Sequence, residues 1–142
     1  MKVLVTGDFG KIHSGHLEHI RQAYDLGDWL IIGTHPDDDI KKRKGYEPDP
    51  ASLRIELLNI FIDGLGGQGS VVMCPDTDGK SVKALELFRP DIFAKGGGYT
   101  LGTMPYEEVE TCLGLGIRIV FGVGERLGQS RDYALSPGHP PK

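Results

Sequence analysis

The stretch GDFGKIHSGHLEHIRQA, residues 7–23, decides the fold because it joins a strand to a helix. Residues 2–6 before it are apolar and rich in β-branched side chains, which predicts a buried strand. Residues 14–26 carry Leu17, Ile20 and Ala23 at helical spacing, and Gly27 is a natural stop. His13 and His16 therefore flank a Ser-Gly pair at the point where a strand passes into a helix.

The rest of the chain repeats this alternation of strand and helix. Strand-like apolar runs recur at residues 29–33, 70–73, 91–95 and 117–121, and helical spacing recurs at 52–63, 81–88 and 106–115. Residues 35–51 are polar and contain three prolines, so we expect a long loop there. The pattern predicts a single-domain, Rossmann-like α/β protein with a five-stranded parallel sheet and helices on both faces. The polar end of the chain, about residues 132–142, is expected to be a flexible tail.

Composition limits the classes of protein that the chain can represent. With 142 residues, 39% of them apolar and 25% charged, the chain is long enough for one globular domain with a core. The net charge of −4 argues against a dedicated nucleic-acid binder. No secretion signal or membrane-spanning run is visible, and Cys74 and Cys112 are far apart, so we expect a cytoplasmic protein with reduced thiols and no membrane partner.

The histidine turn is the strongest chemical signal in the sequence. Ligands of parallel α/β sheets bind at the carboxyl ends of the strands, and residues 7–16 follow the first strand. Gly7 permits a sharp turn, and Gly15 lets backbone approach a ligand at a helix start, where N–H groups attract phosphate. Two imidazoles at this place can donate hydrogen bonds to phosphate oxygens as charge develops on them. Surface histidines or a histidine metal pair are the alternatives, although four suitably spaced zinc ligands are not apparent.

The turn resembles the signature G-x-F-D-x-x-H-x-G-H of the cytidylyltransferase group of small nucleotidyltransferases. The resemblance continues along nearly the whole chain. GTHPDDDIKKRKG looks like the segment that ends in the family's phosphate-binding lysine, and PASLRIELLNIFIDGL looks like the helix with its phosphate-binding arginine. RPDIFAKGGGY is similar to the R-P-D-x-x-x-K-G-G-D-Y element of the heptose-type enzymes, and GERLGQSRDYA stands in the place of R-T-x-G-x-S-T-T-x-I.

This resemblance implies a reaction and a set of site residues. A phosphorylated small molecule attacks the α-phosphorus of a nucleoside triphosphate, and pyrophosphate leaves. Mg²⁺ accompanies the triphosphate, no metal-binding side chains are expected, and a homodimer is the default. Asp37, Asp38 and Asp39 are expected to serve as loop and helix-cap residues. The implied catalytic residues are His13, His16 and Lys44, and the implied nucleotide-binding residues are Gly7, Asp8, Phe9, Lys11, Gly15, Arg54, Lys95, Gly96, Gly97, Arg126, Gly128 and Ser130.

The chain also departs from the family pattern. Gly10 and Gly98 stand where the family has acids, and Arg131 and Asp132 replace two hydroxyl residues. RPDIFAKGGGY favours adenylyl transfer from ATP to a sugar phosphate of the D-glycero-D-manno-heptose 1-phosphate type. GTHPDDDIKKRKG keeps open a cytidylyltransferase that uses CTP with glycerol 3-phosphate or phosphoethanolamine. The lost acid and hydroxyls keep open a nucleotide-binding regulator with weak turnover, which would bind a triphosphate without releasing pyrophosphate.

Overall fold

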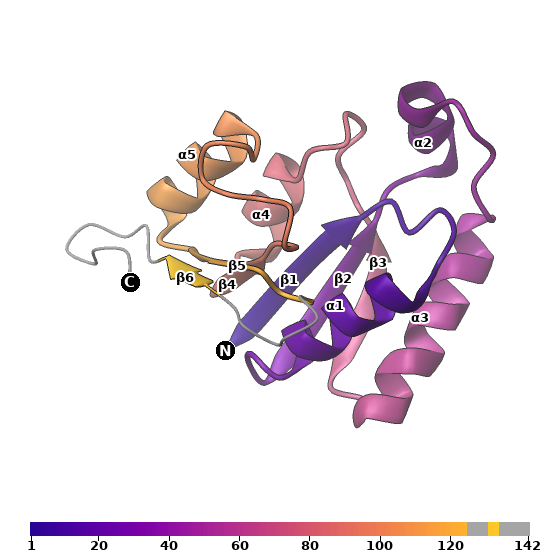
Figure 1. The fold of residues 1–142 in the computed structure, drawn as a ribbon, viewed down its shortest axis with the longest axis horizontal. Helices are drawn as coiled ribbons and strands as arrows, with labels where there is room; N and C mark the ends of the chain where they lie inside the picture. The colour runs from indigo at the N-terminus through magenta and orange to yellow at the C-terminus, as the bar shows by residue number, and fades with distance from the viewer. Residues whose placement is uncertain (125–130, 134–142) are drawn as a thin grey trace.

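A parallel sheet forms the centre of the computed structural model, which describes residues 1–124 and 131–133. Its strand order is β3-β2-β1-β4-β5-β6 (Figure 1). Five strands run parallel, namely β1 (Lys2–Gly7), β2 (Trp29–Thr34), β3 (Gly69–Met73), β4 (Ile92–Ala94) and β5 (Arg118–Phe121). The sequence prediction of a Rossmann-like five-stranded parallel sheet in a single domain is confirmed.

A sixth strand, β6 (Arg131–Tyr133), pairs antiparallel with β5 and was not expected from the sequence. It includes residues 132 and 133, which the sequence assigned to a flexible tail. Arg126, Gly128 and Ser130 lie outside the described residues, as do residues 134–142.

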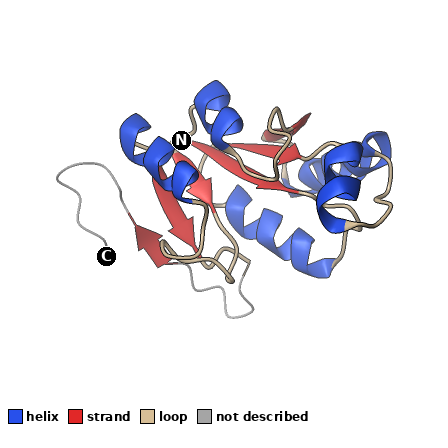
Figure 2. Ribbon diagram, turned by 90° about the horizontal axis from the view of Figure 1, so that it is seen from above, coloured by secondary structure: helices blue, strands red, loops and turns tan. Residues whose placement is uncertain are grey.

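Helices cover both faces of the sheet (Figure 2). On one face, α1 (Ser14–Tyr24) and α3 (Ala51–Leu65) pack against side chains such as Val3, Val5 and Ile32. On the other face, α4 (Val82–Phe88) and α5 (Tyr106–Leu115) pack against Leu4 and Phe93. Successive strand residues thus supply opposite cores, because side chains alternate along a strand. The central strands are buried on both faces, which explains why they are apolar runs in the sequence.

The expectation of an uninterrupted loop over residues 35–51 is wrong, because α2 (Asp37–Lys44) forms within it. Three acids begin this helix and four bases end it, an order that complements the helix dipole. Gly45 ends the helix with a positive φ of 75°, a conformation that glycine adopts without strain. Figure 1 shows α2 beyond the carboxyl ends of β1 and β2. No helix in the described part of the chain has the length and apolar character needed to cross a membrane.

Candidate active site

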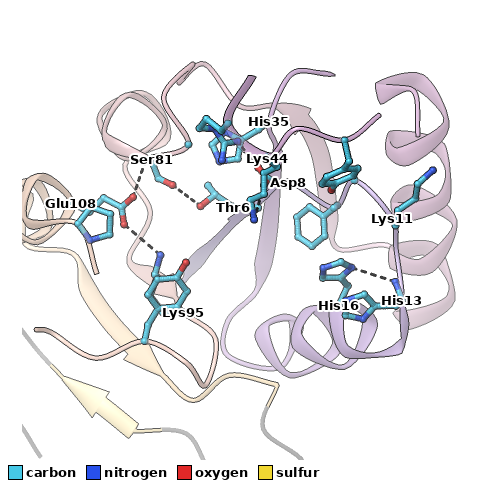
Figure 3. A pocket seen from close by; sticks show the side chains of 18 residues that line it. Thr6, Asp8, Lys11, His13, His16, His35, Lys44, Ser81, Lys95 and Glu108 are labelled. Atoms are coloured by element: carbon cyan, nitrogen blue, oxygen red, sulfur yellow. Dashed lines mark hydrogen bonds and ion pairs between the residues drawn. The ribbon is translucent and has the colours of Figure 1, made fainter. Parts of the chain in front are cut away.

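Two adjoining cavities open at the carboxyl edge of the sheet. The larger has a volume of about 630 Å³ and the smaller about 390 Å³. Both are bounded by the turn after β1, the start of α1 and the segment after β4 (Figure 3). The residues that line both cavities are Thr6, Gly7, Asp8, Phe9, His13, His16, Lys95 and Tyr99. The histidine turn therefore stands between two compartments, an arrangement suited to two substrates.

The two histidines cap the helix that they begin. The His13 Nδ1 atom accepts a hydrogen bond from the Gly15 backbone N–H at 3.1 Å, and His16 Nδ1 accepts one from the His13 N–H at 3.3 Å. These bonds satisfy backbone donors that a helix start leaves without partners. A neutral imidazole whose Nδ1 accepts carries its proton on Nε2. The cap therefore leaves an Nε2–H donor on each ring that lines the cavities.

Phe9 fixes the other side of the His16 ring. Its backbone has φ 50°, in the left-handed region that non-glycine residues rarely adopt, and its side chain is buried. The Phe9 ring meets the His16 ring edge-on, with 5.1 Å between centroids. Burial, with smaller effects from His13 and His19, lowers the pKa of His16 from 6.5 to about 4. His16 is therefore neutral near pH 7. A neutral imidazole suits the role of a hydrogen-bond donor better than that of a general acid.

The last turn of α2 supplies positive charge to the larger cavity. Arg43 lies 2.7 Å from one Asp8 carboxylate oxygen and 2.9 Å from Asp39, and the Lys44 Nζ atom lies 3.3 Å from the other Asp8 oxygen. Burial alone raises the pKa of Asp8, but the hydrogen bond from Arg43 and the nearby positive charges lower it overall. The Lys44 side chain is 54% exposed, so it can move to a phosphate, whereas Arg43 has two acidic partners.

A polar chain forms the wall opposite the histidines. Glu108, on α5, accepts a hydrogen bond from the Ser81 backbone N–H at 2.9 Å, and its other oxygen lies 3.4 Å from the Lys95 Nζ atom. The Ser81 hydroxyl oxygen lies 2.6 Å from the Thr6 hydroxyl oxygen. All four side chains line the larger cavity (Figure 3). Burial raises the pKa of Glu108, although Lys95 opposes the effect.

Arg54 does not reach either cavity, in contrast to the expectation that it binds nucleotide phosphates. Its side chain is 0% exposed, and it donates to the carbonyl oxygens of Asp8, His35 and Asp49. It also donates to the Thr34 hydroxyl and the Asp37 carboxylate. Burial of the guanidinium is tolerated because its Nε, Nη1 and Nη2 groups all donate hydrogen bonds, and these bonds join the turn after β1 to the segments around α2. Arg54 thus stabilises the segments that form the cavity wall without lining the cavity itself.

The structure brings together most of the residues that the sequence singled out. Those in the larger cavity are Gly7, Asp8, Phe9, Lys11, His13, His16, Lys44 and Lys95. Gly15, Gly96 and Gly97 line the smaller cavity. Sequence reasoning missed other lining residues, namely Thr6, Gly10, His35, Arg43, Tyr46, Gly79, Ser81, Tyr99, Pro105 and Glu108, with His19, Ala94, Val123 and Gly124 in the smaller cavity. Glu108 had a signal, since it lies four residues before the buried Cys112, where helical spacing predicts a core residue.

The cavities do not offer a ready set of metal ligands among residues 1–124. Their carboxylates, Asp8 and Glu108, each already face a cation, and no group of three potential ligands gathers within the described residues. The side chains therefore do not fit a resident metal held by the protein alone. Asp37, Asp38 and Asp39 lie in the first turn of α2, where Asp37 pairs with Arg54 and Asp39 with Arg43.

Taken together, a parallel α/β sheet, a histidine-capped helix start and a cavity with cationic side chains at the strand ends are features with which α/β proteins bind phosphate groups. The sequence matches the family model described as cytidylyltransferase-like over residues 4–120. The chain belongs to this cytidylyltransferase-like family, a family of nucleotidyltransferases, which confirms the resemblance seen in the motifs.

Similar proteins agree with this assignment. The chain is 40% identical over 98 residues to the bifunctional protein HldE of Helicobacter hepaticus, which covers 68% of this chain and 19% of that protein. It is 29% identical over 125 residues to the FAD synthase of Pyrococcus abyssi, covering 84% of this chain and 78% of the synthase. The chain thus spans about a fifth of the length of its bifunctional relatives. A lipopolysaccharide core biosynthesis protein from Thermoplasma volcanium shares the fold, with TM-score 0.60, 22% identity and coverage of 82% of this chain and 89% of that one.

Proposed function

We propose that this chain transfers a nucleoside monophosphate from a nucleoside triphosphate to a phosphorylated small molecule. An oxygen of the acceptor's phosphate attacks the α-phosphorus and forms a new phosphoanhydride bond. The bond between the α-phosphorus and the oxygen bridging to the β-phosphorus breaks, and its electrons leave with pyrophosphate. No covalent intermediate on the protein is required, so the protein's task is positioning and charge stabilisation.

This proposal rests on the hydrogen bonds that the two imidazole rings make. Both Nδ1 atoms are occupied by backbone N–H groups, so His13 and His16 present Nε2–H donors to the cavities. The start of α1 adds its own N–H groups and the positive end of the helix dipole. Negative charge grows on the bridging oxygen during transfer and is shared by the non-bridging oxygens around the pentacoordinate phosphorus. Fixed donors at this place stabilise that charge more than they stabilise the bound substrate.

The two cavities suggest how the substrates divide. The smaller cavity is lined by Gly96, Gly97, Val123 and Gly124, whose small or apolar side chains suit a base and ribose. The larger cavity contains Lys11, Lys44 and the polar wall, which suit a phosphorylated acceptor. The triphosphate then passes His13 and His16, where the cavities meet.

We propose ATP as the nucleotide and a sugar phosphate as the acceptor. RPDIFAKGGGY, which includes Lys95, resembles the heptose-type element, and the relatives named HldE and FAD synthase support adenylyl transfer. FAD itself contains an adenylyl group joined to a phosphorylated compound. Magnesium is proposed as part of the triphosphate substrate, where it neutralises phosphate oxygens. We also propose that the protein forms a homodimer and is located in the cytoplasm.

A pyrophosphate-release assay tests the proposed function. The purified chain is incubated with magnesium and ATP, CTP, GTP or UTP, each with heptose 1-phosphate, glycerol 3-phosphate or phosphoethanolamine. Release with ATP and a sugar phosphate is expected. Pyrophosphate release with CTP but with no other triphosphate would show that CTP, and not ATP, is the nucleotide substrate. Triphosphate binding without release in any combination would favour a nucleotide-binding regulator.

A further inference from the structure

The wall of the larger cavity opposite the histidines has features that nucleotidyl transfer alone does not explain. Glu108 is only 1% exposed, and Ser81 only 2%, yet both line the cavity. Burying a carboxylate is unfavourable unless hydrogen bonds and charges compensate it. Here the Ser81 N–H and the Lys95 ammonium do so. The Ser81 hydroxyl in turn makes a hydrogen bond with the Thr6 hydroxyl, so the wall is a continuous polar surface.

Lys95 is held in this wall by contacts with Glu108 and with two aromatic rings. Its Nζ atom lies 3.4 Å from Glu108, 4.2 Å from the centre of the Tyr99 ring and 4.8 Å from that of Phe93. The ammonium therefore balances the buried carboxylate and is stabilised by two aromatic faces. A second cation brought to Glu108 by a ligand would stand beside Lys95 and be repelled by it. Neutral hydroxyl groups meet no such repulsion.

The chemistry of the wall matches hydroxyl groups closely. The Glu108 carboxyl accepts hydrogen bonds, Lys95 donates them, and the Ser81 and Thr6 hydroxyls do either. A diol needs this mixture, because each of its hydroxyls both donates and accepts. Figure 3 shows Glu108, Ser81 and Lys95 at one end of the cavity and His13 and His16 at the other. An acceptor can thus place its phosphate toward the histidines and its carbon chain toward Glu108.

We propose that the wall formed by Thr6, Ser81, Glu108 and Lys95 binds the hydroxyl groups of the acceptor and selects phosphorylated polyols over phosphorylated amines. This inference rests on the proposed function and adds the residues that choose the substrate. It also separates two acceptors that the sequence left together, since glycerol 3-phosphate carries a diol and phosphoethanolamine carries an ammonium group. Glu108 acts here as a specificity residue that touches substrate.

The first test compares these two matched acceptors. Both are phosphate esters of short alcohols, so they differ mainly in the groups that would face Glu108. With the nucleotide that supports release, kcat/KM for glycerol 3-phosphate is expected to exceed that for phosphoethanolamine by about tenfold or more, the discrimination of one or two hydrogen bonds. Equal efficiencies, or a preference for phosphoethanolamine, would overturn the inference and leave nucleotidyl transfer standing. No release with any acceptor would overturn the proposed function itself.

Variants of the wall provide the second test. Glu108→Gln is expected to raise the KM for the hydroxylated acceptor about tenfold and to leave the KM for the nucleotide within about twofold. Glu110→Gln, the same change at an exposed position of α5, is the matched control and is expected to leave both values unchanged. Ser81→Ala keeps the backbone N–H that donates to Glu108 and removes only a wall hydroxyl. This variant therefore tests the wall if Glu108→Gln does not fold. Equal losses for both substrates would show a merely structural role and contradict the inference.

Discussion

The imidazole rings of His13 and His16 stack with 3.7 Å between their centroids and 22° between their planes. One turn of helix brings the rings together, and the capping hydrogen bonds hold both Nδ1 atoms toward backbone. Structure and chemistry thus use opposite edges of the same rings: Nδ1 stabilises the helix start, and Nε2 is left for a ligand. Gly15 favours this geometry, because the Cβ of a larger residue at position 15 would lie about 3.0 Å from the His13 ring and push against it.

Replacing His16 tests the role of its Nε2–H group. His16→Ala is expected to lower turnover about 100- to 1,000-fold, the usual loss when one preorganised transition-state donor is removed. His16→Gln is the matched control, because glutamine at this helix position can still accept the His13 N–H bond. Both variants are expected to lose turnover, and the glutamine variant to melt closer to the parent protein. Near-normal pyrophosphate release by a folded His16→Ala protein would exclude the proposed role.

The pKa of His16 has a consequence for stability. Burial lowers this pKa from 6.5 to about 4, so the folded state favours the neutral ring. The resulting stabilisation is fully present above pH 6.5 and is lost as the pH falls from 6.5 toward 4, because protons then bind the unfolded chain more tightly. Melting temperatures measured between about pH 7.5 and pH 4.5 should therefore fall more steeply for the parent protein than for His16→Gln. Parallel curves would contradict the burial-induced shift.

Lys44 tests the contribution of α2 to phosphate binding. Its Nζ atom lies 3.3 Å from Asp8 on the cavity wall, and its side chain is half exposed. Lys44→Ala is expected to raise the KM for a phosphorylated substrate about 10- to 100-fold, as the loss of one charged hydrogen bond would. Lys42→Ala removes the same charge from the same helix at an exposed position outside both cavities, and is expected to change KM little. An unchanged KM for both substrates in Lys44→Ala would remove Lys44 from the site.

The sequence predicted the parts of this protein that depend on local patterns. The buried strands were visible as apolar runs, and the histidine turn was visible because His13 and His16 are close in the chain. Helix α2 was missed because its residues are almost all polar, yet its acid-to-base order and Gly45 are helix signals. The prolines at 48 and 50 follow the helix and do not interrupt it.

The opposite wall of the site, apart from Lys95, was not predicted from the sequence, for a different reason. Thr6, Ser81, Lys95 and Glu108 come from four separate segments, and only the strand order β1-β4-β5 brings their elements together. Arg54 shows the converse problem. An arginine at a helix start looks the same in sequence whether it faces a phosphate or a ring of carbonyl oxygens, and only the packed structure separates the two.

Arg54 therefore gives a stability prediction. Arg54→Ala removes the guanidinium donors of the Asp8, His35 and Asp49 carbonyl oxygens, of which the Asp8 oxygen keeps the Thr34 hydroxyl as a donor, and is expected to lower the free energy of unfolding by about 3–5 kcal/mol. Arg54→Lys is not expected to restore it, because an ammonium cannot reproduce the planar set of donors. Urea denaturation measures both. A loss below about 1 kcal/mol, together with weaker nucleotide binding, would return Arg54 to the phosphate-binding role.

Tracing a radiolabel through the reaction tests the central claim most directly. The chain is incubated with a sugar phosphate and ATP labelled at either the α- or the γ-phosphorus, and the products are separated. Attack at the α-phosphorus puts the α label in the nucleotide–sugar conjugate and the γ label in pyrophosphate. A γ label on the acceptor, or no transfer of either label by the folded protein, would contradict nucleotidyl transfer at the histidine turn.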